Sequence, residues 1–323
     1  MADYKGIKGV KVVTKATDPT ASEATGTVWY NSTSPTALKY SIQGAAAWAS
    51  GGDLPAAING QACGGTPTAA VSAAGNTPGG VTANVQTYDG TSWTEVNNIN
   101  AARSGIRGTG TTTAFVAWGG ATPTTGTYVE EYDGSSWTEV AGALNTSRYN
   151  TAATGTATAA LATGGNAQDP MTAANESYNG TSWTTLASLN TARQGVSGSG
   201  TIPAAICFGG GNPGALDASE TWNNTSWTTG NPLNTARTKC MGTGTSVPGA
   251  LAFGGRVPSA TAVTEKYDGT SWTEVGDLAT ARGDGGGAGT QTSALAVGGE
   301  PPRSTATEAW TDPVYSVKTV TVS

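Results

Sequence analysis

The chain has 323 residues, a formal net charge of −6, 47 glycines and no histidine. The acidic balance excludes the basic field by which proteins attract nucleic acids. Without histidine the chain has no imidazole base, no histidine metal ligand and no Ser-His-Asp triad. The three cysteines lack the spacing of a metal or redox motif, and we interpret them as small buried hydrophobic residues.

Residues 1 to about 44 precede any repeat. They contain no apolar run long enough for a signal peptide or a membrane span, so we expect a soluble protein made in a cytoplasm. Two strands are predicted, at Val28 to Tyr30 and Leu38 to Ile42, joined by an Asn/Ser/Pro turn. We therefore expect an N-terminal β segment over residues 1–44, used for attachment or assembly, and a second domain over 45–323.

The motif YDGTSWTEV at Tyr88 to Val96 returns as YDGSSWTEV, YNGTSWTTL, WNNTSWTTG and YDGTSWTEV. Its tryptophans recur about every 45 residues, and an apolar run ending in Gly-Gly lies between them. These tryptophans are Trp93, Trp137, Trp183, Trp227 and Trp272. With a weaker first copy ending at Gly75, six units fill about residues 54 to 323.

Each unit contains four short strand-like stretches and no helical periodicity. Four strands in about 45 residues are typical of one propeller blade, so the predicted fold class is all-β, a six-bladed β-propeller. The Asp-Gly or Asn-Gly pair predicts a tight hairpin turn with positive-φ positions. The Tyr and the Trp five residues later then fall on one sheet face, where they can pack together and onto the neighbouring blade.

The Gly-Gly pair after an apolar strand, followed by a Tyr and a spaced Trp, is similar to the repeat of kelch β-propellers. The resemblance covers about five sixths of the chain and implies a kelch-like fold. It does not imply a function, because kelch propellers serve as enzymes, adaptors and structural parts. The copper oxidases of this fold need histidine ligands, which are absent from this chain.

Comparison of the units with one another indicates a recurring charge pair. An arginine follows each outer hairpin, and a glutamate lies two residues before each Tyr or its Trp substitute. The arginines are Arg103, Arg148, Arg193, Arg237 and Arg282, and the glutamates are Glu130, Glu176, Glu220, Glu265 and Glu308. The first unit has Ile58 and Gln86 at these positions, so both charges are lost together. Since a lone buried charge is costly, the joint loss predicts that the two groups meet.

These arginines could instead form an anionic-ligand site, such as a carboxylate clamp. Their recurrence in five equivalent units favours a role in the repeat architecture over a catalytic centre. Acidic residues outside the repeat positions, Asp53, Asp169, Asp217 and Asp284, are scattered beside turn residues, which favours solvated loop positions. We therefore predict a protein that is not an enzyme, with no catalytic, cofactor-binding or metal-binding residues and no cofactor.

Two segments compete for the outer strand of the last unit. Trp48 lies one period before Trp93, and Tyr315 takes the Trp position after Trp310. We favour closure by the strand around Trp48 beside Trp310, because joining the first and last segments locks a ring. The tail VYSVKTVTVS would then pair elsewhere, for example with GVKVVTK.

The N-terminal stretch GTVWYNSTSPTALKYSIQGAAAW is similar to a short β segment of bacteriophage tail-fibre and other virion proteins; an ordinary hairpin is the alternative reading. The resemblance implies a virion location, other virion proteins or a host glycan or protein as partners, and a larger oligomeric assembly, without nucleic-acid binding or membrane insertion. We expect a non-catalytic recognition or assembly module, with GNAQDPMTAAN and GGNPGALDAS as candidate loops. A capsid decoration protein, a glycan-active enzyme and a cellular kelch-type adaptor remain alternatives.

Overall fold

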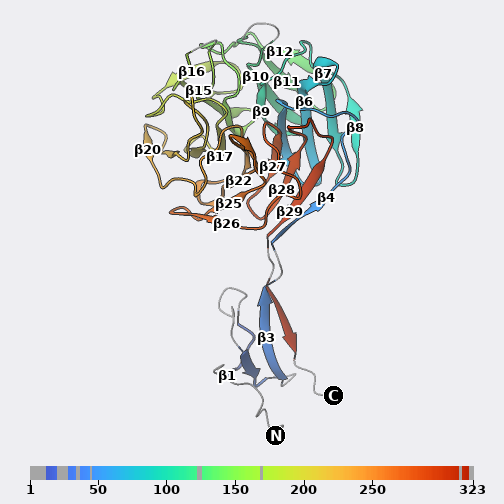
Figure 1. Cartoon of the computed structure of the whole chain (residues 1–323), viewed down its shortest axis with the longest axis vertical. Helices are drawn as coiled ribbons and strands as arrows, with labels where there is room; N and C mark the ends of the chain where they lie inside the picture. Colours follow the sequence, from blue (N-terminus) through green and yellow to red (C-terminus); the bar gives the residue numbers. More distant parts are fainter. Residues whose placement is uncertain are drawn as a thin grey trace. The chain divides into compact units, whose positions relative to one another are not determined.

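The structure is a computed structural model that describes residues 12–19, 28–33, 37–43, 46–121, 126–167, 170–312 and 315–319. The chain divides into a larger unit, Ala47–Thr311, and a smaller unit formed by Met1–Ala46 and Asp312–Ser323. Figure 1 shows the two units. The residues from Asp312 onward thus belong with the N-terminal segment, whereas we expected the second domain to run over 45–323.

The described residues form seven four-stranded sheets, and their only helix is a 3-10 turn, η1 (Val247–Gly249). Six sheets lie in the larger unit and are named sheets 1 to 6 in chain order. Sheet 1 contains β5 (Ala62–Thr66), β6 (Ala69–Thr77), β7 (Gly80–Tyr88) and β8 (Trp93–Val96), and sheet 2 contains β9 (Arg107–Thr111), β10 (Ala114–Trp118), β11 (Val129–Tyr132) and β12 (Trp137–Glu139). Sheet 3 contains β13 (Ala152–Thr156), β14 (Ala159–Thr163), β15 (Asn175–Tyr178) and β16 (Trp183–Leu186), and sheet 4 contains β17 (Ser197–Thr201), β18 (Ala204–Phe208), β19 (Ser219–Trp222) and β20 (Trp227–Thr229). Sheet 5 contains β21 (Met241–Thr243), β22 (Leu251–Phe253), β25 (Thr264–Tyr267) and β26 (Trp272–Glu274), and sheet 6 contains β27 (Gly286–Gly289), β28 (Ser293–Val297), β29 (Thr307–Thr311) and β4 (Ala47–Ser50). A small hairpin, β23 (Arg256–Val257) and β24 (Ser259–Ala260), projects from sheet 5.

The first strands of sheets 1 to 6 contact one another in succession, and β27 of sheet 6 contacts β5 of sheet 1. This places the six sheets around a common axis with their first strands innermost, which is a β-propeller-like arrangement (Figure 1). None of these sheets closes on itself; sheets 1 to 5 are open antiparallel meanders of four strands, and sheet 6 is antiparallel with β4 as its fourth strand. The number of four-stranded sheets is therefore seven rather than the expected six, because the smaller unit contributes one of its own.

Sheet 6 joins the two ends of the larger unit. Its outermost strand is β4, which pairs with β29 so that Trp48 lies opposite Trp310. The prediction that the strand around Trp48 closes the last unit is confirmed. Tyr315, the competing candidate, lies in the smaller unit instead.

The smaller unit is a mixed sheet in the order β1 (Val12–Lys15), β2 (Val28–Asn31), β3 (Ala37–Gln43) and β30 (Tyr315–Thr319). The predicted strand pair is present as β2 and β3, which run antiparallel. The tail strand β30 pairs with β3, whereas β1 pairs with β2 in parallel, so the suggested pairing of the tail with GVKVVTK is wrong. Trp29 is buried in this sheet and donates from Nε1 to the Asp18 carboxylate.

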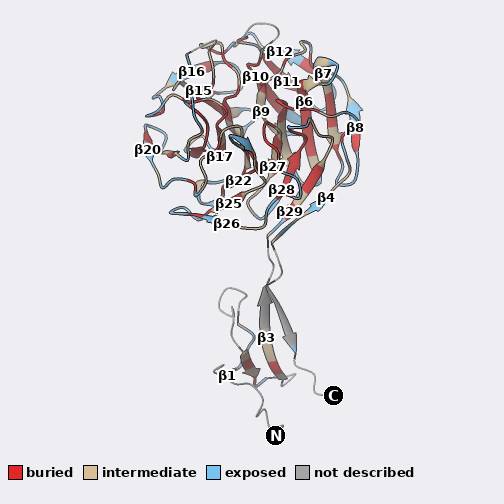
Figure 2. Ribbon diagram, viewed as in Figure 1, coloured by how far each residue is buried: buried red, intermediate tan, exposed pale blue. Residues whose placement is uncertain are grey.

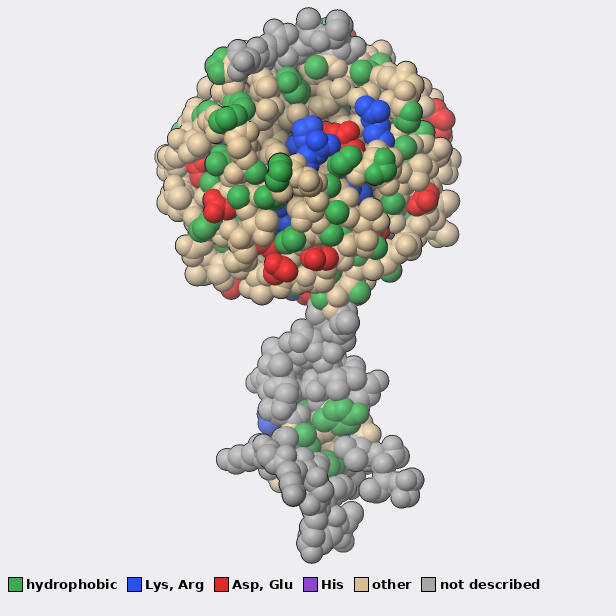
Figure 3. All heavy atoms as spheres, viewed as in Figure 1, with side chains coloured by type: hydrophobic (Ala, Val, Ile, Leu, Met, Phe, Trp, Pro, Cys, Tyr) green, Lys and Arg blue, Asp and Glu red, His purple; other side chains and the backbone are tan. Residues whose placement is uncertain are grey.

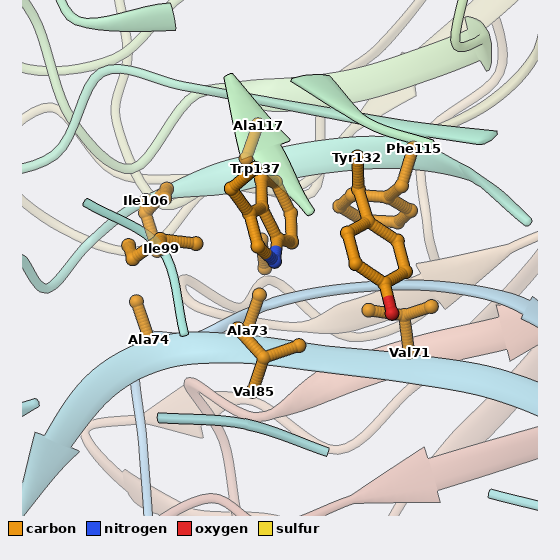
Figure 4. Close-up of a cluster of buried hydrophobic side chains, with 11 residues drawn as sticks. Val71, Ala73, Ala74, Val85, Ile99, Ile106, Phe115, Ala117, Tyr132 and Trp137 are labelled. Carbon is orange, nitrogen blue, oxygen red and sulfur yellow. The ribbon is translucent and has the colours of Figure 1, made fainter. Parts of the chain in front are cut away.

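The recurring aromatic residues pack as the pattern predicts. Tyr132 and Trp137 lie opposite each other in sheet 2, and their rings stack at 5.1 Å. Both belong to one buried cluster with Val71 and Val85 of the preceding sheet 1, as Figure 4 shows. Figure 2 shows how buried residues follow the strands of the larger unit. Each outer aromatic couple thus covers the sheet before it, which explains why the motif recurs.

The outer hairpin is a four-residue loop rather than the two-residue turn that the Asp-Gly pair suggests. In sheet 1, Tyr88 pairs with Trp93, only Gly90 has positive φ, and the Asp89 carboxylate accepts hydrogen bonds from the backbone of Thr91 and Ser92. The Asp side chain therefore caps the loop from within.

Candidate binding site at the mouth of the ring

The five predicted arginine–glutamate pairs are all formed. They are Arg103–Glu130, Arg148–Glu176, Arg193–Glu220, Arg237–Glu265 and Arg282–Glu308. All five arginine side chains are at most 1% exposed. In each pair the glutamate, on the third strand of its sheet, also accepts a backbone N–H from the preceding linker, as Glu220 does from Asn190 at 2.7 Å. The pairs therefore fasten the inter-sheet linkers, and ligands in solvent cannot reach them.

The tryptophans of the repeat are also buried in packing contacts. Trp93, Trp137, Trp183, Trp227 and Trp272 are 5–8% exposed and pack against an aromatic partner in their own sheet. Trp48 packs against Phe253 of sheet 5 and Trp310 of its own sheet. These side chains form the contacts between sheets and offer no open platform for a ligand.

A second set of equivalent positions, which the sequence comparison missed, lies two residues after each arginine or after Ile58. It consists of Gly60, Gly105, Asn150, Gly195, Lys239 and Asp284 and is called the mouth ring. Each N–H donates to the carbonyl of the preceding member, and the Gly60 N–H donates to the Asp284 carbonyl, at 2.7–3.0 Å. Six backbone hydrogen bonds thus close a complete circle at one end of the channel between the innermost strands.

All six members of the mouth ring have positive φ, between 53° and 66°. Three are glycines, which adopt this conformation without steric cost, whereas Asn150, Lys239 and Asp284 carry side chains there. The mouth ring is therefore symmetric in its backbone and asymmetric in its side chains. Comparing the second residue after each repeat arginine, or after Ile58, would have exposed this set.

The side chains of the mouth ring join a charge network. Asp284 is 5% exposed and accepts from Lys239 Nζ at 2.8 Å, Asn59 Nδ2 at 3.2 Å and Arg107 Nη2 at 3.4 Å. Burial by itself would raise the pKa of Asp284, but the nearby Lys239 and Arg107 charges and the hydrogen bonds hold that pKa below its ordinary value. The expectation of a solvated loop position for Asp284 is wrong. A second carboxylate, Glu300, accepts from Arg256 Nη2 at 2.6 Å.

The other acidic residues outside the repeat give no site. Asp53 and Asp217 are exposed, as predicted, and Asp169 lies outside the described residues. Within the described ranges, no three His, Cys, Asp or Glu side chains are grouped so that they could hold a metal ion.

A polar hollow of about 390 Å³ lies at the mouth ring. Asn59, Asn76, Ser104, Tyr149 and Arg303 line it together with five of the six ring members. Behind it, the innermost strands enclose a channel of about 400 Å³ that is lined mainly by Gly, Ala, Ser and Thr, with Arg107 as the single charged residue among the described residues that line it. Figure 3 shows basic side chains beside acidic ones near the middle of the visible face of the larger unit.

Two side chains that line the hollow, those of Asn150 and Arg303, have binding capacity that the described residues do not use. Asn150 is 6% exposed, and its buried Oδ1 has no hydrogen-bond partner within the described part of the chain. Arg303 donates from Nε to Asn59 Oδ1 at 2.8 Å and makes no ion pair with any described residue. A buried unpaired acceptor is costly in a folded protein, so this arrangement suits a ligand that donates a hydrogen bond.

The candidate loops border the same mouth. The described part of GNAQDPMTAAN pairs through Asn166 with Tyr149, and GGNPGALDAS pairs through Gly211 with Gln194. Tyr149 and Gln194 directly precede members of the mouth ring. Both carboxylates of the mouth are held by cations, Asp284 by Lys239 and Glu300 by Arg256. The site offers charged groups and hydrogen-bonding groups to a ligand.

Among the described residues, no helix has the length and apolar character required to cross a membrane. No protein-family model matches the chain, and no curated protein matches it in sequence. In structure the chain is similar to a solved kelch-like propeller-type protein described as "Structure of YjhT", with a TM-score of 0.66 and 14% identity over 82% of this chain and 99% of that one. This likeness supports a β-propeller-like fold for the larger unit.

Proposed function

We propose that the chain is a bacteriophage virion protein in which a six-bladed kelch-like propeller, sheets 1 to 6, acts as a non-catalytic recognition or assembly module. The smaller unit attaches the module to a tail fibre, a spike or another surface-exposed part of the particle. Partners are other virion proteins or a host surface glycan or protein. The proposal rests on the virion-like N-terminal segment together with the architecture of the mouth.

The observation that carries the recognition role is the asymmetric mouth ring. The closed circle of backbone hydrogen bonds forms a rigid frame, and three of its six members present side chains where glycine would be easier to accommodate. Binding residues held on a rigid scaffold are a common basis of recognition.

The path of the chain supports the attachment role. The chain enters the larger unit at Ala47 and leaves it at Thr311, and these two residues pair with each other in the outermost strands of sheet 6. The hollow is lined by innermost segments. Attachment through the chain ends therefore uses a different part of the larger unit from the one that would contact a ligand.

The proposal is tested on particles purified from the source lysate, by mass spectrometry and electron microscopy with the full-length chain and two variants. Trp29→Ala removes a buried side chain of the smaller unit, and we expect it to abolish incorporation into particles. Val81→Ala, at a residue 43% exposed on the larger unit, is the matched control and should be incorporated normally. Absence of the wild-type chain from the particles would refute the virion role, and turnover of a glycan by the purified chain would refute the non-catalytic role and favour the enzyme alternative.

A further inference from the structure

The three side-chain-bearing members of the mouth ring are retained at a cost. Asn150, Lys239 and Asp284 have φ of 53°, 53° and 58°, a region in which the backbone of residues other than glycine is strained. The equivalent positions Gly60, Gly105 and Gly195 show that glycine satisfies the same backbone hydrogen bonds. The side chains at the other three positions therefore serve something other than the closure of the ring.

The charges around the hollow are not balanced. Its two carboxylates, Asp284 and Glu300, are paired with Lys239, Arg107 and Arg256. Arg303 adds a fourth cation that no described carboxylate neutralises. In a chain with a net charge of −6, this local excess of positive charge favours an anionic ligand.

Arg303 and Asn150 both line the hollow. Asn59, which holds Arg303, precedes Gly60, and Gly60 is followed around the ring by Gly105 and Asn150. Both glycines line the hollow without a side chain, and Asn150 Oδ1 lies 3.1 Å from where a Cβ on Gly105 would stand. A ligand in the hollow therefore has Arg303 and Asn150 among the residues around it.

We propose that the hollow binds a small carboxylate whose neighbouring carbon carries a hydroxyl or amide N–H donor, with Arg303 contacting the carboxylate and Asn150 Oδ1 accepting from the donor. A single guanidinium matches a carboxylate in charge and in its two-pronged geometry. The donor satisfies the buried amide oxygen, which distinguishes this ligand from a plain aliphatic acid. This inference does not depend on whether the chain belongs to a particle.

The test is ligand-observed NMR on the full chain, with titrations that give a Kd for each probe. Glycolate represents the hydroxy acids. N-acetylglycine represents acylated amino acids and the carboxyl ends of peptides. Comparing the two probes shows whether a hydroxyl or an amide N–H is the preferred donor. Ethylene glycol and N-acetylglycinamide are the matched neutral probes, and acetate is the acid that lacks the donor. We expect at least one donor-bearing acid to bind about tenfold more tightly than its neutral counterpart and than acetate.

Three variants locate the site. Arg303→Gln should weaken binding about tenfold, and Lys266→Gln, which removes a cation that does not line the hollow, should change the Kd by less than about twofold. Asn150→Gly should weaken binding severalfold without lowering the thermal unfolding midpoint, because glycine suits this φ. The proposal is overturned if neutral probes or acetate bind as well as the donor-bearing acids, or if no probe binds. It is also overturned if Lys266→Gln weakens binding as much as Arg303→Gln does, or if Asn150→Gly leaves binding intact or unfolds the chain.

Discussion

Trp48 of β4 lies directly opposite Trp310 of β29, with ring centroids 5.5 Å apart and an interplanar angle of 45°. The pair joins a strand from the beginning of the larger unit to one from its end. Trp48 also contacts Phe253 of sheet 5 at 4.9 Å and donates from Nε1 to Thr264 Oγ1. One side chain therefore completes sheet 6 and covers sheet 5, so that the first segment of the larger unit holds its last two sheets together.

Replacing Trp48 by alanine removes this closure. We expect Trp48→Ala to lower the free energy of unfolding by about 2–4 kcal/mol, because the ring contacts are lost and a cavity forms between sheets 5 and 6. Chemical denaturation followed by tryptophan fluorescence measures the change. Val81→Ala, on the exposed hairpin of sheet 1, should stay within about 0.5 kcal/mol of wild type. Equal effects of the two changes would contradict the role of Trp48.

The Arg193–Glu220 pair tests whether the buried charges depend on each other. The Nη2–Oε1 distance is 3.0 Å, and the two residues are 0% and 2% exposed. Arg193→Met leaves a buried carboxylate without its cation and should destabilise the chain by about 3–5 kcal/mol. The double variant Arg193→Met, Glu220→Gln resembles the first unit, with Ile58 and Gln86, and should recover part of that loss. Equilibrium unfolding of the wild type, the two single variants Arg193→Met and Glu220→Gln, and the double variant gives the coupling energy. Additive losses would show that the two side chains act independently.

The repeat itself predicted a large part of this fold. The spacing of Trp93 and its equivalents predicted four-stranded units, the Tyr-Trp couple predicted which sheet faces meet, and the joint loss at Ile58 and Gln86 predicted the buried pairs. These features are local or recur in every unit, so one sequence contains several copies of the same evidence. The bacteriophage virion role stays a proposal, because the structural likeness concerns the fold alone.

The candidate site could not be predicted in the same way. The bond between Asn59 and Asp284 joins residues 225 positions apart, and it exists only because the ring brings the first and last linkers together. Asp284 stands beside glycines in the sequence, which is typical of a solvated turn, yet the closed ring buries it. The pairing of β30 with β3 is another contact between chain ends that no local pattern specifies.

A methyl group added to the mouth ring should be costly. Gly105 has φ of 66°, and a Cβ there would lie 3.0 Å from Tyr149 Cδ2 and 3.1 Å from Asn150 Oδ1. We expect Gly105→Ala to destabilise the chain by about 1–2 kcal/mol from the backbone conformation, with a further loss from crowding. Gly214→Ala, where a Cβ would meet nothing within 4 Å, is the matched control and should be neutral or slightly stabilising. Thermal unfolding distinguishes the two, and a neutral Gly105→Ala would mean that the ring tolerates side chains at no cost.

The Asp284 carboxylate should make stability depend on pH in a defined direction. Burial alone would raise its pKa, but Lys239 and Arg107 lower the pKa below its ordinary value in the folded state. The ionised form is therefore favoured by folding, and its contribution is fully present above the unfolded-state pKa of about 4 and is lost as the pH falls through the lower folded-state pKa. We expect Asp284→Asn to be less stable than wild type at pH 7, with a difference that shrinks steadily below about pH 4. Urea unfolding of both proteins at each pH measures this difference, and subtraction cancels the contributions that the two proteins share. A difference that stays constant or grows as the pH falls would contradict an ion-paired Asp284.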